Sequence, residues 1–230
     1  MSFLLNILLF PVSLLYKIFS LIDRQLKKMR RTDHPNLFII SVDNLTFGGS
    51  GKTSMVRHLA EAFTRRRIPF SVVSRGYKSS VRSGCREVSV DDTAGAAGEE
   101  ALMIKHLFPE STVMIGPDRL TALKRLQSTQ IRIVILDDGF QSAHIRKDFS
   151  ILLDTPGKPF HYYRCFRFLA RSTDLHLLYQ PDESPCPVLQ SPCERYWFRH
   201  LGLRNAQGDP IDPGETPMTA FSALGDNERF

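Results

Sequence analysis

NLFIISVDNLTFGGSGKT, residues 36–53, decides the fold, because here a short apolar run leads into a glycine-rich loop. Asn36–Val42 is rich in branched apolar residues and predicts a buried β-strand. Residues 43–50 follow as a loop, and Gly51–Arg66 carries apolar residues at helical spacing. A glycine-rich loop between a strand and a helix is the context that a phosphate-binding loop requires, so the sequence predicts such a loop here.

The residues of this loop match the chemical needs of a bound nucleoside triphosphate. Its glycines let backbone N–H groups turn toward one point without Cβ clashes, and the helix N-terminus adds partial positive charge. Lys52 is expected to reach the β- and γ-phosphates, and the Thr53 hydroxyl is expected to bind Mg²⁺. The standard pattern has glycine where Thr46 stands, so the loop is a variant. The predicted nucleotide-binding residues are Thr46, Gly48, Gly49, Ser50, Gly51, Lys52 and Thr53.

The rest of the chain continues the alternation of strands and helices. Apolar runs predict strands at Phe70–Ser74, Thr112–Ile115, Ile131–Leu136, Phe149–Asp154 and Leu175–Tyr179. Helices are expected at Glu99–Phe108 and Asp118–Gln127. Strands that alternate with helices indicate a parallel sheet covered on both faces, so we expect an α/β fold of the P-loop NTPase type with flanking helices.

Carboxylates follow one of these strands and open one of these helices. Asp137 and Asp138 come directly after Ile131–Leu136. A strand that ends in Asp places a carboxylate at the carboxyl edge of the sheet, beside the phosphate loop, where a metal site needs it. Glu99 and Glu100 open a helix, where acidic residues often only stabilise the helix dipole. The functional alternative is a carboxylate that orients or deprotonates an acceptor hydroxyl, and spacing alone leaves both interpretations open.

The N-terminal segment is apolar and is followed by a basic cluster. Residues 3–22 read FLLNILLFPVSLLYKIFSLI, which is long enough to span a bilayer but is interrupted by Pro11 and Lys17. The basic cluster comprises Arg24, Lys27, Lys28, Arg30 and Arg31. This order suits a helix in the surface of an anionic leaflet, and a spanning helix or a helix packed on its own domain are the alternatives. The net charge of +6 also indicates an anionic partner, whereas no aromatic-plus-basic motif indicates nucleic acid.

Taken together, these residues resemble one family closely, the tetraacyldisaccharide 4′-kinases, which are the lipid A kinases of Gram-negative bacteria. The matching blocks are LLFPVSLLY with its basic tail, DNLTFGGSGKT, VVSRGYK, GEEALM, ILDDGFQ with RKDFSILLD, and MTAFSALGDNERF. The family also carries threonine at the position of Thr46. The resemblance implies ATP as the phosphoryl donor with Mg²⁺, and the 4′-hydroxyl of a lipid A disaccharide precursor as the acceptor. It also implies a peripheral or monotopic location at the cytoplasmic face of the bacterial inner membrane, on its lipid surface.

The resemblance implies a role for each matching site residue. The catalytic residues by this reading are Glu99, Lys52 and Asp138, and the metal ligands are Thr53, Asp137, Asp138 and Glu100. Glu99 falls where the family has an aspartate assigned as the catalytic base, and Glu100 matches the adjacent glutamate. Arg75, in the SRGY block, is assigned to substrate or phosphate.

The chain departs from the family at several positions. Asp43 stands where the family usually has glycine, Ser54 where it usually has proline, and Ser142 where it usually has histidine. Glu99 is one methylene longer than the family's aspartate, which is expected to displace the base by about 1 Å, a misplacement that can lower a rate about a hundredfold. The family's LPAGPLRE-like stretch is poorly represented between residues 154 and 170.

Three regions are expected along the chain. Residues 1–32 form a membrane-associated helix and basic segment, 33–185 a nucleotide-binding core, and 186–230 the start of a smaller, partial C-terminal lobe. The family's later Asp-His-His segment does not occur, so we expect either a fragment or a short form with impaired catalysis that only binds nucleotide. The loop alone also fits a membrane-associated P-loop ATPase switch, although such switches typically carry a lysine where this chain has Phe47. The oligomeric state is not specified by the sequence.

Overall fold

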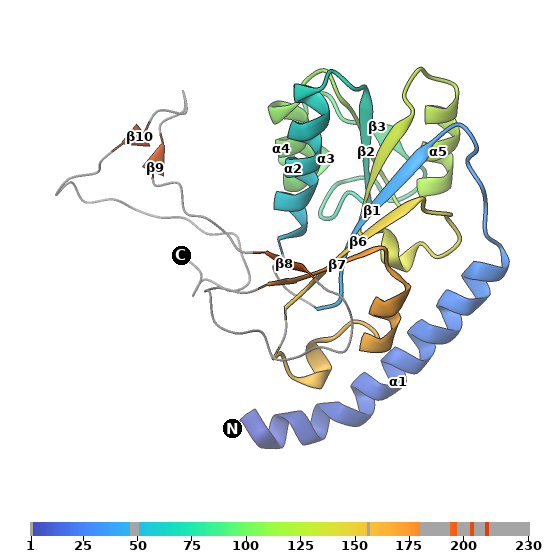
Figure 1. Ribbon diagram of the computed structural model, residues 1–230, viewed down its shortest axis with the longest axis vertical. Coiled ribbons are helices and arrows are strands. Elements are labelled where there is room, and N and C mark those ends of the chain that lie inside the picture. The colour runs from blue at the N-terminus through green and yellow to red at the C-terminus, as the bar shows by residue number, and fades with distance from the viewer. Residues whose placement is uncertain are drawn as a thin grey trace.

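The computed structural model describes residues 2–46, 51–155, 157–179, 194–196, 203–204 and 210–211. Its centre is a sheet of eight strands in the order β3-β4-β2-β5-β1-β6-β7-β8 (Figure 1). The strands are β1 Phe38–Asn44, β2 Phe70–Ser74, β3 Arg86–Glu87, β4 Thr112–Ile115, β5 Ile133–Asp137, β6 Phe149–Asp154, β7 Leu175–Tyr179 and β8 Glu194–Tyr196. Every pairing in this sheet is parallel except that of β3 with β4. A separate antiparallel pair joins β9 Leu203–Arg204 to β10 Pro210–Ile211.

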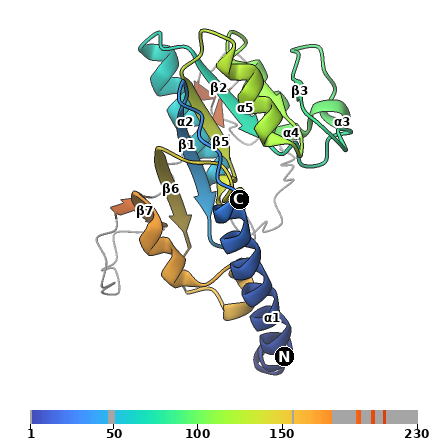
Figure 2. The ribbon, with the colours of Figure 1, turned by 90° about the vertical axis from the view of Figure 1, so that its right-hand side faces the viewer.

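Helices cover both faces of the sheet, as the alternation of strands and helices predicts (Figures 1 and 2). The α-helices are α1 Ser2–Met29, α2 Lys52–Arg65, α3 Ala94–Ala97, α4 Glu99–Leu107 and α5 Arg119–Gln127. Three short 3₁₀ helices are η1 Gly139–Gln141, η2 Phe160–Tyr162 and η3 Arg167–Ser172. Helices α2, α3 and α4 lie on one face, α5 lies on the other, and α1 runs along the lower edge of the molecule (Figure 1). The predicted α/β fold is therefore confirmed.

The two faces of the sheet bury separate apolar clusters. Val56 and Ala60 of α2 and Ile104 of α4 pack on one face against strand residues such as Val42 and Val72. On the other face, α5 contributes Ala122, Leu123 and Leu126, which pack against residues of β1, β2, β4 and β5. Because both faces are covered, the central strands read as continuous apolar runs and not as alternating ones, which is why they stand out in the sequence.

Strand register brings the predicted site residues to one edge. Val42 of β1 pairs with Asp137 of β5, and Val73 of β2 pairs with Leu136, so that Ser74 lies beside Asp137. The residues that follow β1 and β5 therefore emerge side by side at the carboxyl edge. In open parallel sheets this edge is where ligands bind.

Four strands have the bounds predicted from sequence, and two are shifted. The predicted strand Asn36–Val42 is observed at Phe38–Asn44, because Asp43 and Asn44 pair with Leu152 and Leu153 of β6. The strand expected at 131–136 begins at Ile133 and includes Asp137. The expected C-terminal lobe at 186–230 lies almost wholly outside the described residues.

Candidate active site

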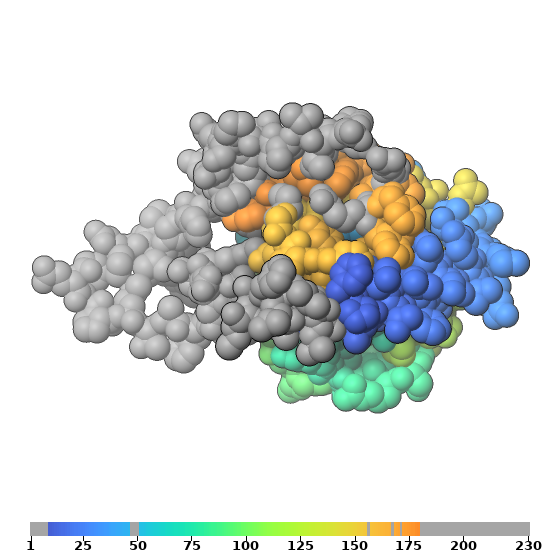
Figure 3. All heavy atoms as spheres, turned by 90° about the horizontal axis from the view of Figure 1, so that it is seen from below, coloured from blue at the N-terminus to red at the C-terminus, as the bar shows by residue number. Residues whose placement is uncertain are grey.

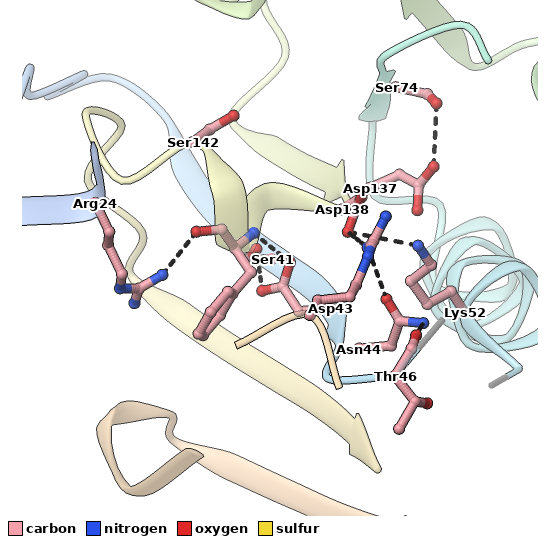
Figure 4. Close-up of polar contacts among 12 residues, drawn as sticks. Arg24, Ser41, Asp43, Asn44, Thr46, Lys52, Ser74, Asp137, Asp138 and Ser142 are labelled. Atoms are coloured by element: carbon pink, nitrogen blue, oxygen red, sulfur yellow. Dashed lines mark hydrogen bonds and ion pairs between the residues drawn. The ribbon is translucent and has the colours of Figure 1, made fainter. Parts of the chain in front are cut away.

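The candidate site lies where β1, β2 and β5 end and α2 begins (Figure 4). Gly51 precedes α2 in a left-handed conformation, with φ of 78°, which is the backbone geometry that favours glycine. Lys52 and Thr53 form the first turn of α2, so their side chains start from the positive end of the helix. The predicted loop residues Gly48, Gly49 and Ser50 lie outside the described part of the chain, and their role stays a prediction. Thr46 is described and forms an antiparallel bridge with Tyr163.

Asp138 is the most highly connected carboxylate of the site. Its Oδ1 lies 3.5 Å from Lys52 Nζ and 2.8 Å from Arg164 Nη1. Burial opposes its ionisation, but Lys52, Arg164 and Arg119 outweigh that effect and hold the pKa of Asp138 below its usual value. Asp138 is therefore a carboxylate at neutral pH, held between two cations.

Asp137 and Glu100 experience the opposite electrostatic balance. Burial raises the pKa of Asp137, although Lys52 counteracts the shift, and the charge of Asp138 adds to it. Burial likewise raises the pKa of Glu100, and Asp137 raises it further, while Lys52 and an interaction with the Thr53 hydroxyl act in the opposite direction. The Ser74 hydroxyl donates to Asp137 Oδ2 at 3.0 Å and fixes that carboxylate. Asp137 and Glu100 thus lie close to the ionised Asp138 in surroundings that disfavour their own negative charge.

A divalent cation beside Asp137 and Glu100 would favour their ionised forms. Thr53, Ser74, Glu100 and Asp137 line one pocket between α2 and α4, together with the apolar residues Val56, Val72, Ala101 and Ile104. Within the described ranges, no group of three or more His, Cys, Asp or Glu side chains is arranged to hold a metal ion by itself. Mg²⁺ at a phosphate site is commonly held by one or two carboxylates plus the phosphates, so the residues present fit the predicted ion when nucleotide accompanies it.

The structure separates the two neighbouring glutamates. Both glutamates are exposed in the first turn of α4, but only Glu100 lines the pocket beside Thr53 and Asp137. The prediction of Glu100 as a residue beside the metal thus has a geometric basis in the pocket. The assignment of Glu99 as the base stays a prediction.

Two of the departures from the family have structural roles. Asp43 is fully buried and accepts hydrogen bonds from the Ser41 hydroxyl at 2.6 Å and from the Phe140 N–H at 2.5 Å. Ser142 is buried and accepts from Arg119 Nη1 at 2.8 Å. Both residues hold the loop that follows Asp138 against the sheet, so they support the site from beneath. Ser54 is exposed on α2.

Several supporting residues were not found by sequence reasoning. Arg164 bridges Asp138 and Asn44, whose Oδ1 accepts from Arg164 Nη1 at 3.1 Å. Asn44 in turn donates to the Thr46 carbonyl at 2.7 Å, which ties the start of the phosphate loop to the same arginine. Arg164 lies in the stretch that matches the family poorly, so no motif pointed to it. The one available signal was a basic residue in a stretch, 157–170, that contains no Asp or Glu.

Lys147, beneath the site, provides a pH-dependent test of this packing. Burial lowers the pKa of Lys147 from 10.5 to about 8, although Asp43 acts in the opposite direction. The unfolded chain therefore binds more protons than the folded chain between these values, and stability contributed by Lys147 rises with pH across that window. We expect Lys147→Met to be more stable than wild type at pH 7, with the advantage shrinking between about pH 8 and 10. Thermal denaturation at a series of pH values measures this difference.

The control for this prediction is Lys124→Met, which removes an exposed lysine from α5. Its stability relative to wild type is expected to stay nearly constant over the same pH range. If the stability difference between Lys147→Met and wild type were equally independent of pH, a buried ammonium group with a lowered pKa at Lys147 would be contradicted.

Comparisons with known proteins agree with this geometry. A model of the family described as tetraacyldisaccharide-1-P 4′-kinase (LpxK) matches residues 5–166. The tetraacyldisaccharide 4′-kinase of Geobacter sulfurreducens is 39% identical over 141 residues, which cover 59% of this chain and 39% of that protein. The corresponding kinase of Aquifex aeolicus is 31% identical over 245 residues, covering 96% of this chain and 75% of that protein.

A solved structure extends the similarity to the fold. A crystal structure of LpxK from Aquifex aeolicus in complex with ATP superimposes with a TM-score of 0.75 and 28% sequence identity. The match covers 90% of this chain and 69% of that one. The chain spans only 39% of the Geobacter kinase and 34% of the Chlamydia muridarum kinase.

Proposed function

The chain belongs to the tetraacyldisaccharide-1-P 4′-kinase family, and from this premise we propose that it transfers the γ-phosphoryl group of ATP to the 4′-hydroxyl of a tetraacyldisaccharide 1-phosphate. The observation that carries the proposal is the convergence of Lys52, Asp137, Asp138 and Glu100 on the start of α2. Phosphoryl transfer depends mainly on placement and on neutralising charge, and this is what such a cluster provides. The family match disfavours the alternative ATPase switch, which rested on the loop alone.

Each residue has a task in this proposal. Lys52 binds the β- and γ-phosphates from the first turn of α2, and the backbone amides of the phosphate loop also bind these phosphates. Thr53, Asp137, Asp138 and Glu100 would hold Mg²⁺, which when bound neutralises charge on the phosphates. Arg164 already contacts Asp138 and adds a second cation beside Lys52. Glu99 is proposed to accept the proton of the acceptor hydroxyl.

The function is tested by incubating the whole chain with MgATP labelled in the γ-phosphate and with tetraacyldisaccharide 1-phosphate. A labelled product phosphorylated at the 4′ position is the expected result. Nucleotide binding without transfer would instead identify a form that binds ATP but lacks catalysis. Transfer to protein or water with none to the lipid would contradict the proposed acceptor.

The role of Glu99 is tested by Glu99→Gln, which keeps the size of the side chain and removes the base. We expect turnover to fall about a hundredfold, the lower range for loss of general base catalysis, while nucleotide affinity is unchanged. Single-turnover kinetics and equilibrium binding of ATP measure the two quantities separately. Glu110→Gln, at another exposed position, is the control. Unchanged turnover in Glu99→Gln would leave Glu99 with a helix-dipole role alone.

We also propose that α1 lies on the cytoplasmic face of the bacterial inner membrane, with its apolar side in the lipid surface. The polar side of α1 faces the protein: Lys17 is fully buried and donates to the Phe160 carbonyl at 2.5 Å. The apolar residues on the outer side are exposed, namely Phe10, Val12, Leu15, Tyr16, Ile18, Phe19, Ile22, Leu26 and Met29. This arrangement reverses the usual amphipathic helix, whose apolar side faces the protein core.

A second aromatic group extends this surface. Figure 3 shows α1 alongside the segment that contains η2 and η3, and the rings of Phe10 and Phe160 are 5.0 Å apart. Tyr162 and Phe168 of this segment are also exposed. Among the described helices, none combines enough length and apolar character to cross a bilayer. These features support a helix that lies in the interface, with Lys27, Lys28, Arg30 and Arg31 of the basic cluster near the headgroups.

Phe19→Glu tests the lipid surface, because Phe19 is 70% exposed and is therefore not needed for packing. Burying a phenylalanine side chain is worth about 1.5–3 kcal/mol, so vesicle affinity is expected to fall roughly tenfold or more. Co-sedimentation with vesicles of phosphatidylcholine and phosphatidylglycerol measures the change. Met103→Glu, at an exposed apolar position on α4, is the matched control and should leave vesicle affinity unchanged. Equal effects of both substitutions would refute α1 as the docking surface.

A further inference from the structure

The peptide at Phe140 is held from two directions by elements far apart in the sequence. Its N–H donates to Asp43 Oδ1, at the end of β1, and its carbonyl accepts from Arg24 Nη1 of α1 at 2.7 Å (Figure 4). The Arg24 guanidinium also stacks 3.8 Å from the centre of the Phe140 ring. The N-terminal helix is therefore joined directly to the loop that leaves β5.

Asp138 begins that loop in a left-handed conformation, with φ of 52° and ψ of 45°. A residue other than glycine occupies this region at a conformational cost, and it persists there when the surroundings fix it. Three hydrogen bonds fix it here. The Asp138 N–H donates to the Val42 carbonyl at 2.9 Å, Arg119 Nη1 donates to the Asp138 carbonyl at 2.7 Å, and the Phe140 peptide is held two residues further on.

We infer that Arg24 is a positioning residue for Asp138. Helix α1 would then support the nucleotide site in addition to its proposed role at the membrane surface. The inference rests on the proposed function, because it assigns Arg24 to the metal-binding half of that site. The contacts of the Arg24 guanidinium are with Phe140. It acts through Phe140, whose fixed backbone determines where the Asp138 carboxylate points.

Arginine suits this position for two physical reasons. Its planar guanidinium can donate to the carbonyl and stack on the aromatic ring at the same time, which a lysine ammonium does less well. Phe140 is buried, so loss of Arg24 would leave the Phe140 carbonyl without a hydrogen-bond donor in surroundings that water reaches poorly. The loop would then be more stable in a conformation that gives this carbonyl another donor. In that conformation Asp138 would lose the support for its left-handed backbone.

A second contact from α1 reaches the same site by another path. Lys17 holds the Phe160 carbonyl, and its ammonium lies 3.1 Å from the centre of the Phe160 ring. The segment that follows supplies Tyr163, which bridges to Thr46, and Arg164, which binds Asp138. Two side chains of α1 on the same side of the helix thus support the two chain segments that flank Asp138.

The experiment compares ATP affinity with and without Mg²⁺ in the whole chain. In Arg24→Gln we expect MgATP affinity to fall roughly tenfold, the lower end of the range for residues that support metal ligands. Affinity for ATP in the presence of a chelator should change much less, because that binding depends on Lys52 and the loop amides. Arg24→Lys keeps the charge but not the planar fork, so its MgATP affinity should lie between those of the wild type and Arg24→Gln.

Arg132→Gln is the matched control, since Arg132 also donates to backbone carbonyls but precedes β5 at the opposite edge of the sheet. It should leave both affinities unchanged. The inference is overturned if Arg24→Gln behaves like Arg132→Gln, or if it weakens ATP binding equally with and without Mg²⁺. If Arg24→Gln does not fold, as judged by circular dichroism, Arg24→Lys carries the same test. If the wild-type chain binds no ATP at all, the proposed function fails, whereas Mg²⁺-independent loss in the variant refutes only the role of Arg24.

Discussion

Lys52→Ala is expected to reduce phosphoryl transfer to the lipid acceptor by about a thousandfold, the upper range for removing one group that stabilises transition-state charge. Lys52 starts from the first turn of α2, and its ammonium lies 3.5 Å from Asp138, so it is already directed toward the metal-binding edge. Alanine removes the charge while retaining a good helix former at that position. The rate of label transfer from γ-labelled ATP measures the loss.

Lys124→Ala, at an exposed position on α5, controls for the removal of one lysine. It should leave transfer unchanged. Retention of full activity in Lys52→Ala would exclude the Gly48–Thr53 loop from the reaction, and with it the central proposal. A loss of activity accompanied by unfolding is distinguished by the thermal melting temperature.

Asp138→Asn is expected to lower Mg²⁺-dependent turnover by at least about a hundredfold. Asparagine tolerates the left-handed backbone that Asp138 adopts, so the substitution removes charge with little change of conformation. Lys52 and Arg164 then lose their shared carboxylate partner, which also removes an anion that positions both cations. We therefore expect the dependence of the rate on Mg²⁺ concentration to shift to higher concentration.

Ser142→Asn is not a suitable control for this change, because Ser142 contacts Arg119 beneath the site. Asp91→Asn is suitable, since Asp91 is an exposed carboxylate between β3 and α3 and does not line the pocket. Turnover in Asp138→Asn that equals that of Asp91→Asn would show that Asp138 has no part in the chemistry. Steady-state rates at a series of Mg²⁺ concentrations decide between these outcomes.

The sequence predicts the sheet well because buried parallel strands consist of uninterrupted apolar runs. Phe70–Ser74 and Thr112–Ile115 were predicted with the bounds that the structure has. The edge strand β3 was missed, because two residues that pair antiparallel at the rim carry no apolar run. The polar end of β1 was also missed, since Asp43 and Asn44 continue the strand by pairing with β6.

The site was predictable only where its chemistry depends on local sequence. Asp138 follows β5 directly and Lys52 opens α2 after the glycine-rich loop, so motif and strand position together indicate their place. Arg164 lies 26 residues after Asp138 in the sequence. Their contact depends on how the 157–170 segment packs, which sequence spacing does not reveal. The orientation of α1 was hidden for a similar reason. Lys17 interrupts an apolar segment in the sequence, but in the structure it and Arg24 both bind α1 to the rest of the protein.

That orientation has a practical consequence for anyone who shortens the chain to improve its solubility. Removing the apolar N-terminal helix would allow the protein to be handled without detergent. It would also remove Lys17 and Arg24, which contact the aromatic rings of Phe160 and Phe140. The buried Phe140 ring would then face water, and the Phe160 ring would be more exposed than it already is, next to the loop that carries Asp138. A truncated protein that handles well in aqueous buffer is thus a poor substitute for the intact one in nucleotide measurements.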